Sequence, residues 1–215
     1  MHKLERPKAP DCLEDFQHGR NNWSYVSHND KEVIWQQLDV MQQKRCAYCE
    51  NTLQDKKGNR KAHIEHLRQR NRYPQGTFQW DNLFGSCNRN NSCGNYKDRL
   101  PLYNHADIIK MDIEDPEHFF LFVSDGTIVI RSELSEQDKD RAQETLRVFN
   151  LDSMNGSLRH MRKIAIQGYL QTAEELLQLA TEFDREEWYP LLQEEINKTK
   201  HLPFSTAIKH ILIPS

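Results

Sequence analysis

Hydrophobic positions follow different periods in different parts of the 215-residue chain, and this pattern predicts a mixed α+β fold. An irregular arm with two prolines, Pro7 and Pro10, comes first. A helix capped by Asn29 or Asp30 is predicted to follow and to run through Gln42, because Asn and Asp side chains accept hydrogen bonds from the first turn of a helix. The apolar stripe of this helix consists of Val33, Ile34, Leu38 and Met41.

The C-terminal half is predicted to contain one β-hairpin followed by helices. Two short apolar runs, 119–123 and 127–130, flank Ser124-Asp125-Gly126, and glycine supplies the positive φ that a tight turn needs. Helices are predicted over 136–149, 158–181 and 185–198, the last kinked or restarted at Pro190, with a short segment after Pro203. The core-facing stripe of the second helix is predicted to be Leu170, Ala173, Leu177 and Ala180.

The stretch from Cys46 to Arg99 is rich in Asn, Gly and Arg and has only short apolar runs. A strand is predicted over 61–67, after a turn at 57–59. A segment with so little apolar area needs a covalent or metal link to fold. We therefore divide the chain into an N-terminal arm and helix at 1–43, a small cross-linked domain at 44–104, and a hairpin with a helical region at 105–215.

Charge is distributed unevenly along the chain, although its net value is only −3. The middle segment, 44–104, has 12 Lys and Arg against 5 Asp and Glu, whereas 1–43 has 5 against 7 and 105–215 has 12 against 20. Phosphate binding depends on local charge more than on the total. The basic middle is therefore predicted to meet an anion, and the acidic tail is predicted to meet a protein.

Composition places the chain among ordinary globular proteins and predicts a cytoplasmic location with no membrane partner. Its longest apolar run, 119–123, is much shorter than the roughly 20 residues of a membrane-spanning helix, and the N-terminus lacks an apolar stretch of signal-peptide type. Because cytosolic thiols stay reduced, the five cysteines are expected to be metal ligands or free thiols.

Four of the cysteines form two close pairs. Two residues separate Cys46 from Cys49, and five separate Cys87 from Cys93. Four thiolates complete a tetrahedral zinc site without water, and such a site stabilises a domain that buries little apolar surface. A redox role for the first pair is disfavoured, since no βαβ pattern follows it. We predict structural Zn²⁺ at these four residues and a free thiol at Cys12.

Candidate catalytic groups lie between the two cysteine pairs, in His63-Ile64-Glu65-His66. Neighbouring side chains of a strand point to opposite faces, so Glu65 and His66 can lie on either side of one phosphate. Phosphodiester hydrolysis needs such an arrangement, with a base beside the attacking water and a cation beside the leaving oxygen. His63 shares a face with Glu65 and would either add a nitrogen ligand, which favours Mn²⁺, or be an ordinary structural histidine. His63 and His66 are three positions apart, whereas the two zinc-binding histidines of the protease motif are four positions apart.

Two later motifs, Trp80-Asp81-Asn82-Leu83-Phe84 and Cys93-Gly94-Asn95-Tyr96-Lys97, complete a pattern that resembles the HNH nucleases, the ββα-metal fold. The resemblance implies an α+β protein with a zinc-stapled ββα-metal core and a mostly helical C-terminal region that contains a hairpin. It also implies Mg²⁺ or Mn²⁺ as the catalytic ion. The implied roles are general base for His66, metal ligands for Glu65 and Asn95, and anchor of the His66 strand for Asn82.

The resemblance extends to the PtuB-like HNH subunits of Septu-type and retron-associated anti-phage systems. It is based on His-x-Glu-His with a basic run after it, on Trp-Asp-Asn-Leu, and on apolar spacing in the tail. It implies an ABC or SMC-like ATPase partner that controls the nuclease, and a reverse transcriptase with its nucleic acid where the system is a retron. The acidic tail, 105–215, is predicted to bind the ATPase. The alternative is that two copies of the protein associate through the tail.

The sequence thus predicts a metal-dependent HNH endonuclease that cuts nucleic acid, DNA in preference to RNA, as the effector of an anti-phage complex. Two alternatives are a degenerate HNH fold that only binds nucleic acid through its zinc knuckle, and an adaptor whose tail is the functional part. An intact Glu65, His66 and Asn95 favour the enzyme, because a binding module needs no general base. The candidate phosphate contacts are Arg68, Arg70, Arg72 and Lys97.

Overall fold

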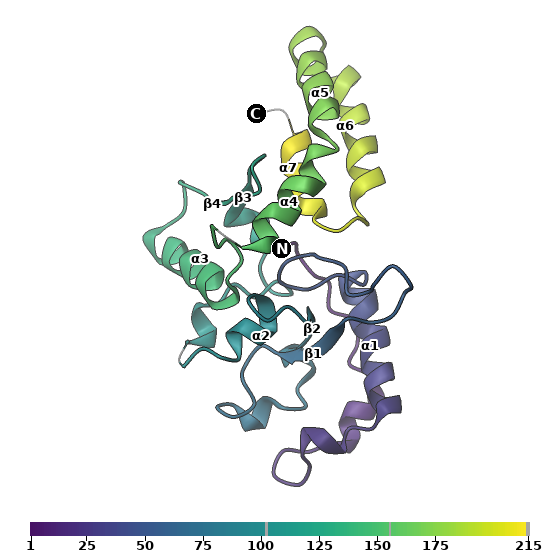
Figure 1. The fold of residues 1–215 in the computed structure, drawn as a ribbon, viewed down its shortest axis with the longest axis vertical. Coiled ribbons are helices and arrows are strands. Elements are labelled where there is room, and N and C mark those ends of the chain that lie inside the picture. Colours follow the sequence, from purple (N-terminus) through teal and green to yellow (C-terminus); the bar gives the residue numbers. More distant parts are fainter. Residues whose placement is uncertain (102, 155, 214–215) are drawn as a thin grey trace.

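The computed structural model describes residues 1–101, 103–154 and 156–213. Within these residues there are seven α-helices and two separate two-stranded antiparallel sheets, which confirms the mixed α+β class (Figure 1). Among the described helices, none is both long and apolar enough to span a lipid bilayer.

The first helix, α1 (His28–Gln42), begins slightly earlier than predicted because Ser27 is its cap. The Ser27 hydroxyl accepts a hydrogen bond from the Asp30 backbone, and the Asp30 carboxylate accepts one from the Ser27 backbone, which together form a capping box. The buried face includes Ile34, Trp35 and Leu38, whereas Val33 of the predicted stripe is 38% exposed.

The middle of the chain forms a strand–strand–helix unit. Strand β1 (Ala62–His66) pairs in antiparallel register with β2 (Leu83–Cys87), and the short helix α2 (Cys93–Lys97) follows. Every residue of β2 is buried, because α1 packs against it and because the Gln42 side chain bonds both backbone groups of Gly85. A side chain at Gly85 would meet the Trp35 ring at 2.7 Å, so this close packing requires glycine.

The predicted hairpin is confirmed by β3 (Phe120–Phe122) and β4 (Ile128–Ile130). Its turn contains Gly126 at a φ of 88°. The fully buried Arg162 donates hydrogen bonds to the carbonyl of Gly126 and to the Asp152 carboxylate, and it thereby fixes the turn against the helical region.

The helical region contains α3 (Glu136–Phe149), α4 (Ser157–Gln167), α5 (Leu170–Glu182), α6 (Arg185–Thr199) and α7 (Ser205–Leu212). The prediction of one helix over 158–181 was wrong, because the chain breaks between α4 and α5 at Gly168 and Tyr169. Gly168 keeps helical dihedrals, and the backbone leaves helical geometry at Tyr169, with a φ of −121° and a ψ of 1°. Because glycine is a poor helix former, it weakens the helix at this point. Helix α6, by contrast, continues through Pro190.

A main hydrophobic core draws residues from all three predicted segments. The ring of Tyr48, next to the first cysteine pair, stacks on Phe149 of α3 with centroids 4.0 Å apart. A second, smaller core joins α5, α6 and α7 through Leu176, Leu192 and Ile208. This second core supports the α5–α6 hairpin, which projects from the rest of the molecule (Figure 1).

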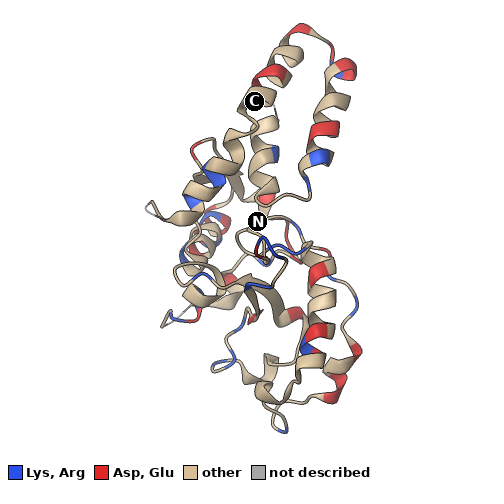
Figure 2. Ribbon diagram, turned by 45° about the vertical axis from the view of Figure 1, so that its right-hand side comes forward, with Lys and Arg blue, Asp and Glu red and all other residues tan. Residues whose placement is uncertain are grey.

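The predicted core stripe of α5 was wrong in two of its members. Leu170 is 36% exposed and Leu177 is 45% exposed, and Leu176 is the buried residue of this helix instead. The helix packs against α6 and α7, and two of its apolar residues, Leu170 and Leu177, face outward. Acidic residues gather at the far end of the hairpin, where α5 ends and α6 begins (Figure 2).

Candidate metal centre and adjoining polar cluster

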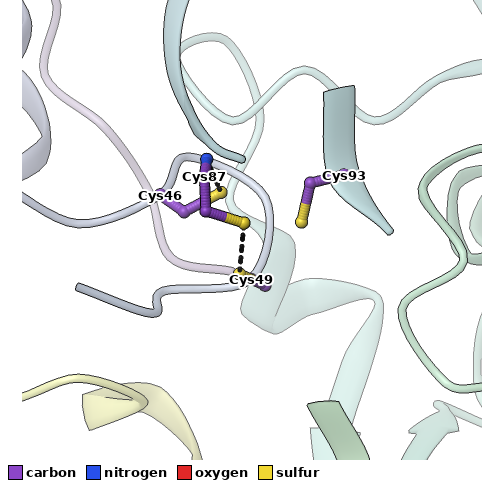
Figure 3. Close-up of side chains that lie close together, drawn as sticks. All are labelled: Cys46, Cys49, Cys87 and Cys93. Atoms are coloured by element: carbon purple, nitrogen blue, oxygen red, sulfur yellow. Dashed lines mark hydrogen bonds between the residues drawn. The ribbon is translucent and has the colours of Figure 1, made fainter. Parts of the chain in front are cut away.

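The four cysteines predicted to bind zinc lie together in the structure (Figure 3). All four are buried, and their sulfur atoms lie within 4.8 Å of one another. The Sγ atoms of Cys49 and Cys87 are 3.9 Å apart, close to the roughly 3.8 Å edge of a tetrahedron with Zn–S bonds of about 2.3 Å. Because a disulfide needs about 2.05 Å, these are free thiols in a group whose geometry suits a zinc ion.

Local backbone structure holds the cysteines in place. Cys46 and Cys49 lie in a tight turn, in which the Glu50 amide donates to the Cys46 carbonyl, and the Ala47 amide donates to the Gly85 carbonyl of β2. Cys87 ends β2, and Cys93 opens α2 at a φ of 58°. The cluster therefore ties the turn, the sheet and α2 together.

The electrostatics of the cluster favour a bound cation. Burial by itself would raise the pKa of the Cys46 thiol, but hydrogen bonds from the other three sulfurs lower it well below its ordinary value. The pKa of Cys93 is raised by burial and by its sulfur neighbours. Four thiolates at this spacing repel one another, and only a positive ion allows all of them to ionise.

Beside the cysteines, Glu65 is buried within a network of charged groups. Its Oε2 lies 3.0 Å from Nε2 of His63, and its Oε1 pairs with the ammonium of Lys97. His63 Nδ1 is 2.8 Å from the Asn88 side chain, and Lys97 also lies 2.9 Å from the Asp98 carboxylate. Burial alone would raise the pKa of Glu65, but Lys97 and His63 lower it below its usual value, so Glu65 is a carboxylate.

The α2 helix approaches Glu65 closely because Gly94 has no side chain. A Cβ at this position would lie 2.3 Å from the Glu65 carboxylate oxygen. The Gly94 amide donates to the Ser86 hydroxyl of β2, which fixes the start of the helix. Asn95, the next residue of α2, is half-buried. Glycine is unfavourable inside a helix, so its presence at position 94 is the feature of the sequence that indicates a close approach between α2 and Glu65.

His66 points to the opposite face of β1, as strand alternation requires. Its Nε2 lies 3.0 Å from the Thr77 carbonyl, so Nε2 carries the proton, and Nδ1 has no hydrogen-bond partner within the described parts of the chain. The Trp23 ring meets the imidazole edge-on, with centroids 4.5 Å apart. Burial and the charge of Arg70 lower the pKa of His66 to about 4, which leaves the ring neutral at neutral pH.

Asn82 ties the loop between β1 and β2 to the end of β1. Its Oδ1 accepts a hydrogen bond of 2.7 Å from the Arg68 amide, and its Nδ2 donates to the carbonyls of Arg68 and Gly76. The side chain is 1% exposed, so these bonds form without competition from water. Gly76 directly precedes Thr77, so the bond from Asn82 also helps to fix the Thr77 carbonyl that contacts His66.

The four candidate phosphate contacts differ in their surroundings. Lys97 is fully buried and its ammonium bonds Glu65 and the His66 carbonyl, so its predicted role as a surface contact was wrong. A short helix packed against β1 turns this residue inward, which spacing alone did not indicate. The Arg68 guanidinium is paired with Asp81 at 2.9 Å, whereas Arg70 and Arg72 are exposed.

No protein-family model matches this chain, and no curated protein sequence matches it. Two residues that contact His66, Trp23 and Thr77, carried no recognised signal in the sequence. Trp23 belongs to the N-terminal arm and is 43 positions from His66 in the sequence, so the contact could not be predicted from the sequence pattern.

Proposed function

We propose that this protein is a metal-dependent HNH-type endonuclease with a structural zinc ion. One observation carries the proposal: adjacent residues of β1, Glu65 and His66, face opposite sides of the strand, and a cysteine cluster locks β2 and α2 around them. A buried carboxylate and a neutral imidazole at this spacing suit phosphodiester hydrolysis.

His66 would act as the general base. Its Nε2 proton is engaged with the Thr77 carbonyl, which leaves the Nδ1 lone pair to take a proton from water. Trp23 and the loop held by Asn82 fix the ring in this orientation. A fixed, neutral imidazole is ready to accept a proton without first losing one.

The catalytic ion we propose is a hard divalent cation, Mg²⁺ or Mn²⁺. Glu65 would hold it through a carboxylate oxygen, Asn95 through its amide oxygen, and His63 through a nitrogen. Such an ion would stabilise the charge that develops on the leaving oxygen. Lys97 already neutralises Glu65, so ion binding competes with this internal ammonium and is expected to be weak before the substrate phosphate arrives.

Cleavage is expected to require added Mg²⁺ or Mn²⁺, and Glu65→Gln and Asn95→Ala should each raise the half-maximal ion concentration by at least about tenfold, because each removes one of few ligands. Titration of the ion against the initial cleavage rate of labelled DNA and RNA measures this. Glu194→Gln and Asn197→Ala on α6 are the matched controls. Activity that persists after EDTA treatment, with zinc retained, would count against the proposal.

The ion pair between Lys97 and Glu65 favours a second candidate, a degenerate HNH fold that binds nucleic acid without cutting it. In that case the ammonium permanently replaces the catalytic ion. The same titration separates the two candidates. A binding module retains nucleic acid at every ion concentration and cleaves none.

We further propose that the enzyme acts on DNA in preference to RNA in an anti-phage complex, controlled by an ABC or SMC-like ATPase and, in a retron, accompanied by a reverse transcriptase. Support for a protein partner comes from the exposed apolar residues of the acidic α5–α6 hairpin. Net negative charge repels nucleic acid and leaves this surface for a protein.

Leu170→Glu combined with Leu177→Glu should reduce co-purification of the proposed ATPase partner by at least about tenfold, because each charge would be buried at the contact. Ile113→Glu, at a residue that is 65% exposed elsewhere on the surface, is the control. Sedimentation of the isolated protein tests the alternative, which is self-association through the exposed apolar residues of the α5–α6 hairpin. Undiminished ATPase binding by the double variant would show that the partner docks elsewhere.

A further inference from the structure

A groove of about 550 Å³ lies beside His66, between the N-terminal arm and the loop that joins β1 to β2. The arm contributes Arg20, Trp23 and Tyr25, and the loop contributes Arg70, Asn71 and Thr77. This volume is within the range of ligand pockets, roughly 300–1,000 Å³. Two of the lining residues, Trp23 and Thr77, are the ones that contact His66.

The groove is built to receive an anion. None of the described residues that line it carries a carboxylate, although the arm segment as a whole is acidic. Arg20 and Arg70 are both exposed, and neither forms an ion pair with another described residue, in contrast to Arg68 with Asp81. Two unpaired guanidiniums on facing walls suit phosphate groups.

The groove also presents an aromatic surface. Tyr25 is 65% exposed, which is unusual for so large a ring in an ordered arm. An exposed aromatic face stacks on a nucleobase, and it does so only when the base is unpaired, because neighbouring pairs cover the base faces in a duplex. The amide of Asn71 can then meet the edge of the base with a donor or an acceptor.

The arm is held firmly enough to act as one wall of a binding site. Trp80 donates its indole proton to the Pro7 carbonyl at 2.9 Å, and the Phe16 and Phe78 rings stack with centroids 5.4 Å apart. Arg6 donates to the carbonyls of Trp80 and Leu83. These contacts join the arm to the last part of the β1–β2 loop and to the start of β2.

From these features we infer that the groove binds an unpaired nucleotide of a nucleic-acid strand, next to the phosphate that His66 faces. Arg20 and Arg70 contact the backbone phosphates, and Tyr25 stacks on the base. The N-terminal arm is thus the element that selects single-stranded or locally opened substrate. The position next to a scissile phosphate depends on the proposed function, whereas strand binding in the groove does not.

The test measures binding of short fluorescein-labelled single strands, of DNA and of RNA, and of a duplex of the same sequence, by anisotropy without added Mg²⁺ or Mn²⁺. Arg20→Gln combined with Tyr25→Ala should weaken single-strand binding by at least about tenfold and change duplex binding little. The matched control combines Arg185→Gln with Tyr189→Ala, an Arg and an exposed Tyr on α6. Comparison of the DNA strand with the RNA strand shows whether the groove prefers deoxyribose or ribose.

Equal single-strand binding by the groove variant and the wild type would overturn the inference, as would the absence of single-strand binding by the wild type. If the groove variant is poorly folded, photocrosslinking of a 5-iodouracil strand to the wild-type protein decides: an adduct on Tyr25 or Trp23 supports the groove, and adducts only elsewhere refute it. The wild type could bind single strands through the groove and yet cleave no nucleic acid under any condition tested. That result would refute the proposed nuclease activity, but the inference about strand binding would hold.

Discussion

Replacement of Cys49 by serine is expected to abolish stoichiometric zinc binding and to unfold the middle of the protein. Structural zinc contributes on the order of 10 kcal/mol or more to folding, comparable with the about 5–15 kcal/mol that stabilises a whole domain. All four sulfurs lie in the main core, so the loss spreads from the turn to β2 and α2. Metal analysis and thermal melting measure both effects.

Cys12→Ser is the matched control, because this half-buried thiol lies outside the cluster and donates a hydrogen bond to the Asp30 carbonyl. It should retain about one zinc per chain and melt like the wild type. Cobalt substitution gives a further readout, since four thiolates around Co²⁺ produce a tetrahedral spectrum. A zinc-free wild-type protein that melts cooperatively at an unchanged temperature would refute the site.

Replacement of His66 by alanine is expected to lower the cleavage rate by roughly 10²-fold to 10⁴-fold, the contribution of a positioned general base. The imidazole is 6% exposed and packs on Trp23, so the variant also leaves a cavity and should melt at a lower temperature. Single-turnover cleavage at saturating substrate separates the chemical step from binding.

Added imidazole distinguishes the two effects of this substitution. A small base that enters the cavity should restore part of the cleavage rate of His66→Ala, whereas a purely structural defect would not respond. His160→Ala, at an exposed histidine of α4 outside the groove, is the control and should retain its chemical rate. Full activity of His66→Ala without imidazole would exclude His66 as the base.

The local elements were largely predictable because short-range patterns determine them. Two short apolar runs and a Gly-containing turn between them predicted the hairpin, and the polar residues Asn29 and Asp30 predicted the start of α1 to within a few positions. The division between α4 and α5 was missed, since one glycine in a long amphipathic stretch is weak evidence for a break. The exposed face of α5 was missed for another reason: periodicity identifies an apolar stripe but not what covers it.

The candidate site was predictable where its chemistry depends on residues close in the sequence. Two cysteine pairs indicated a cluster, and strand alternation placed Glu65 and His66 on opposite faces. Lys97 was misassigned because its burial depends on how α2 packs, a tertiary property. The contact of Trp23 with His66 joins positions far apart in the chain, and a single sequence holds no record of such a pair.

The cysteine cluster also has a consequence for synthesis on the ribosome. Cys49 and Cys87 are 38 positions apart, so the first pair leaves the exit tunnel well before the second. The nascent chain then carries a half-site with two cysteines, while β2, Gly94 and Lys97 have not yet emerged from the tunnel. Glu65 and His66 therefore acquire their surroundings only after the second pair has emerged and the metal shell can close. The order of translation thus delays assembly of the Glu65 and His66 surroundings until the second half of the cysteine cluster has emerged.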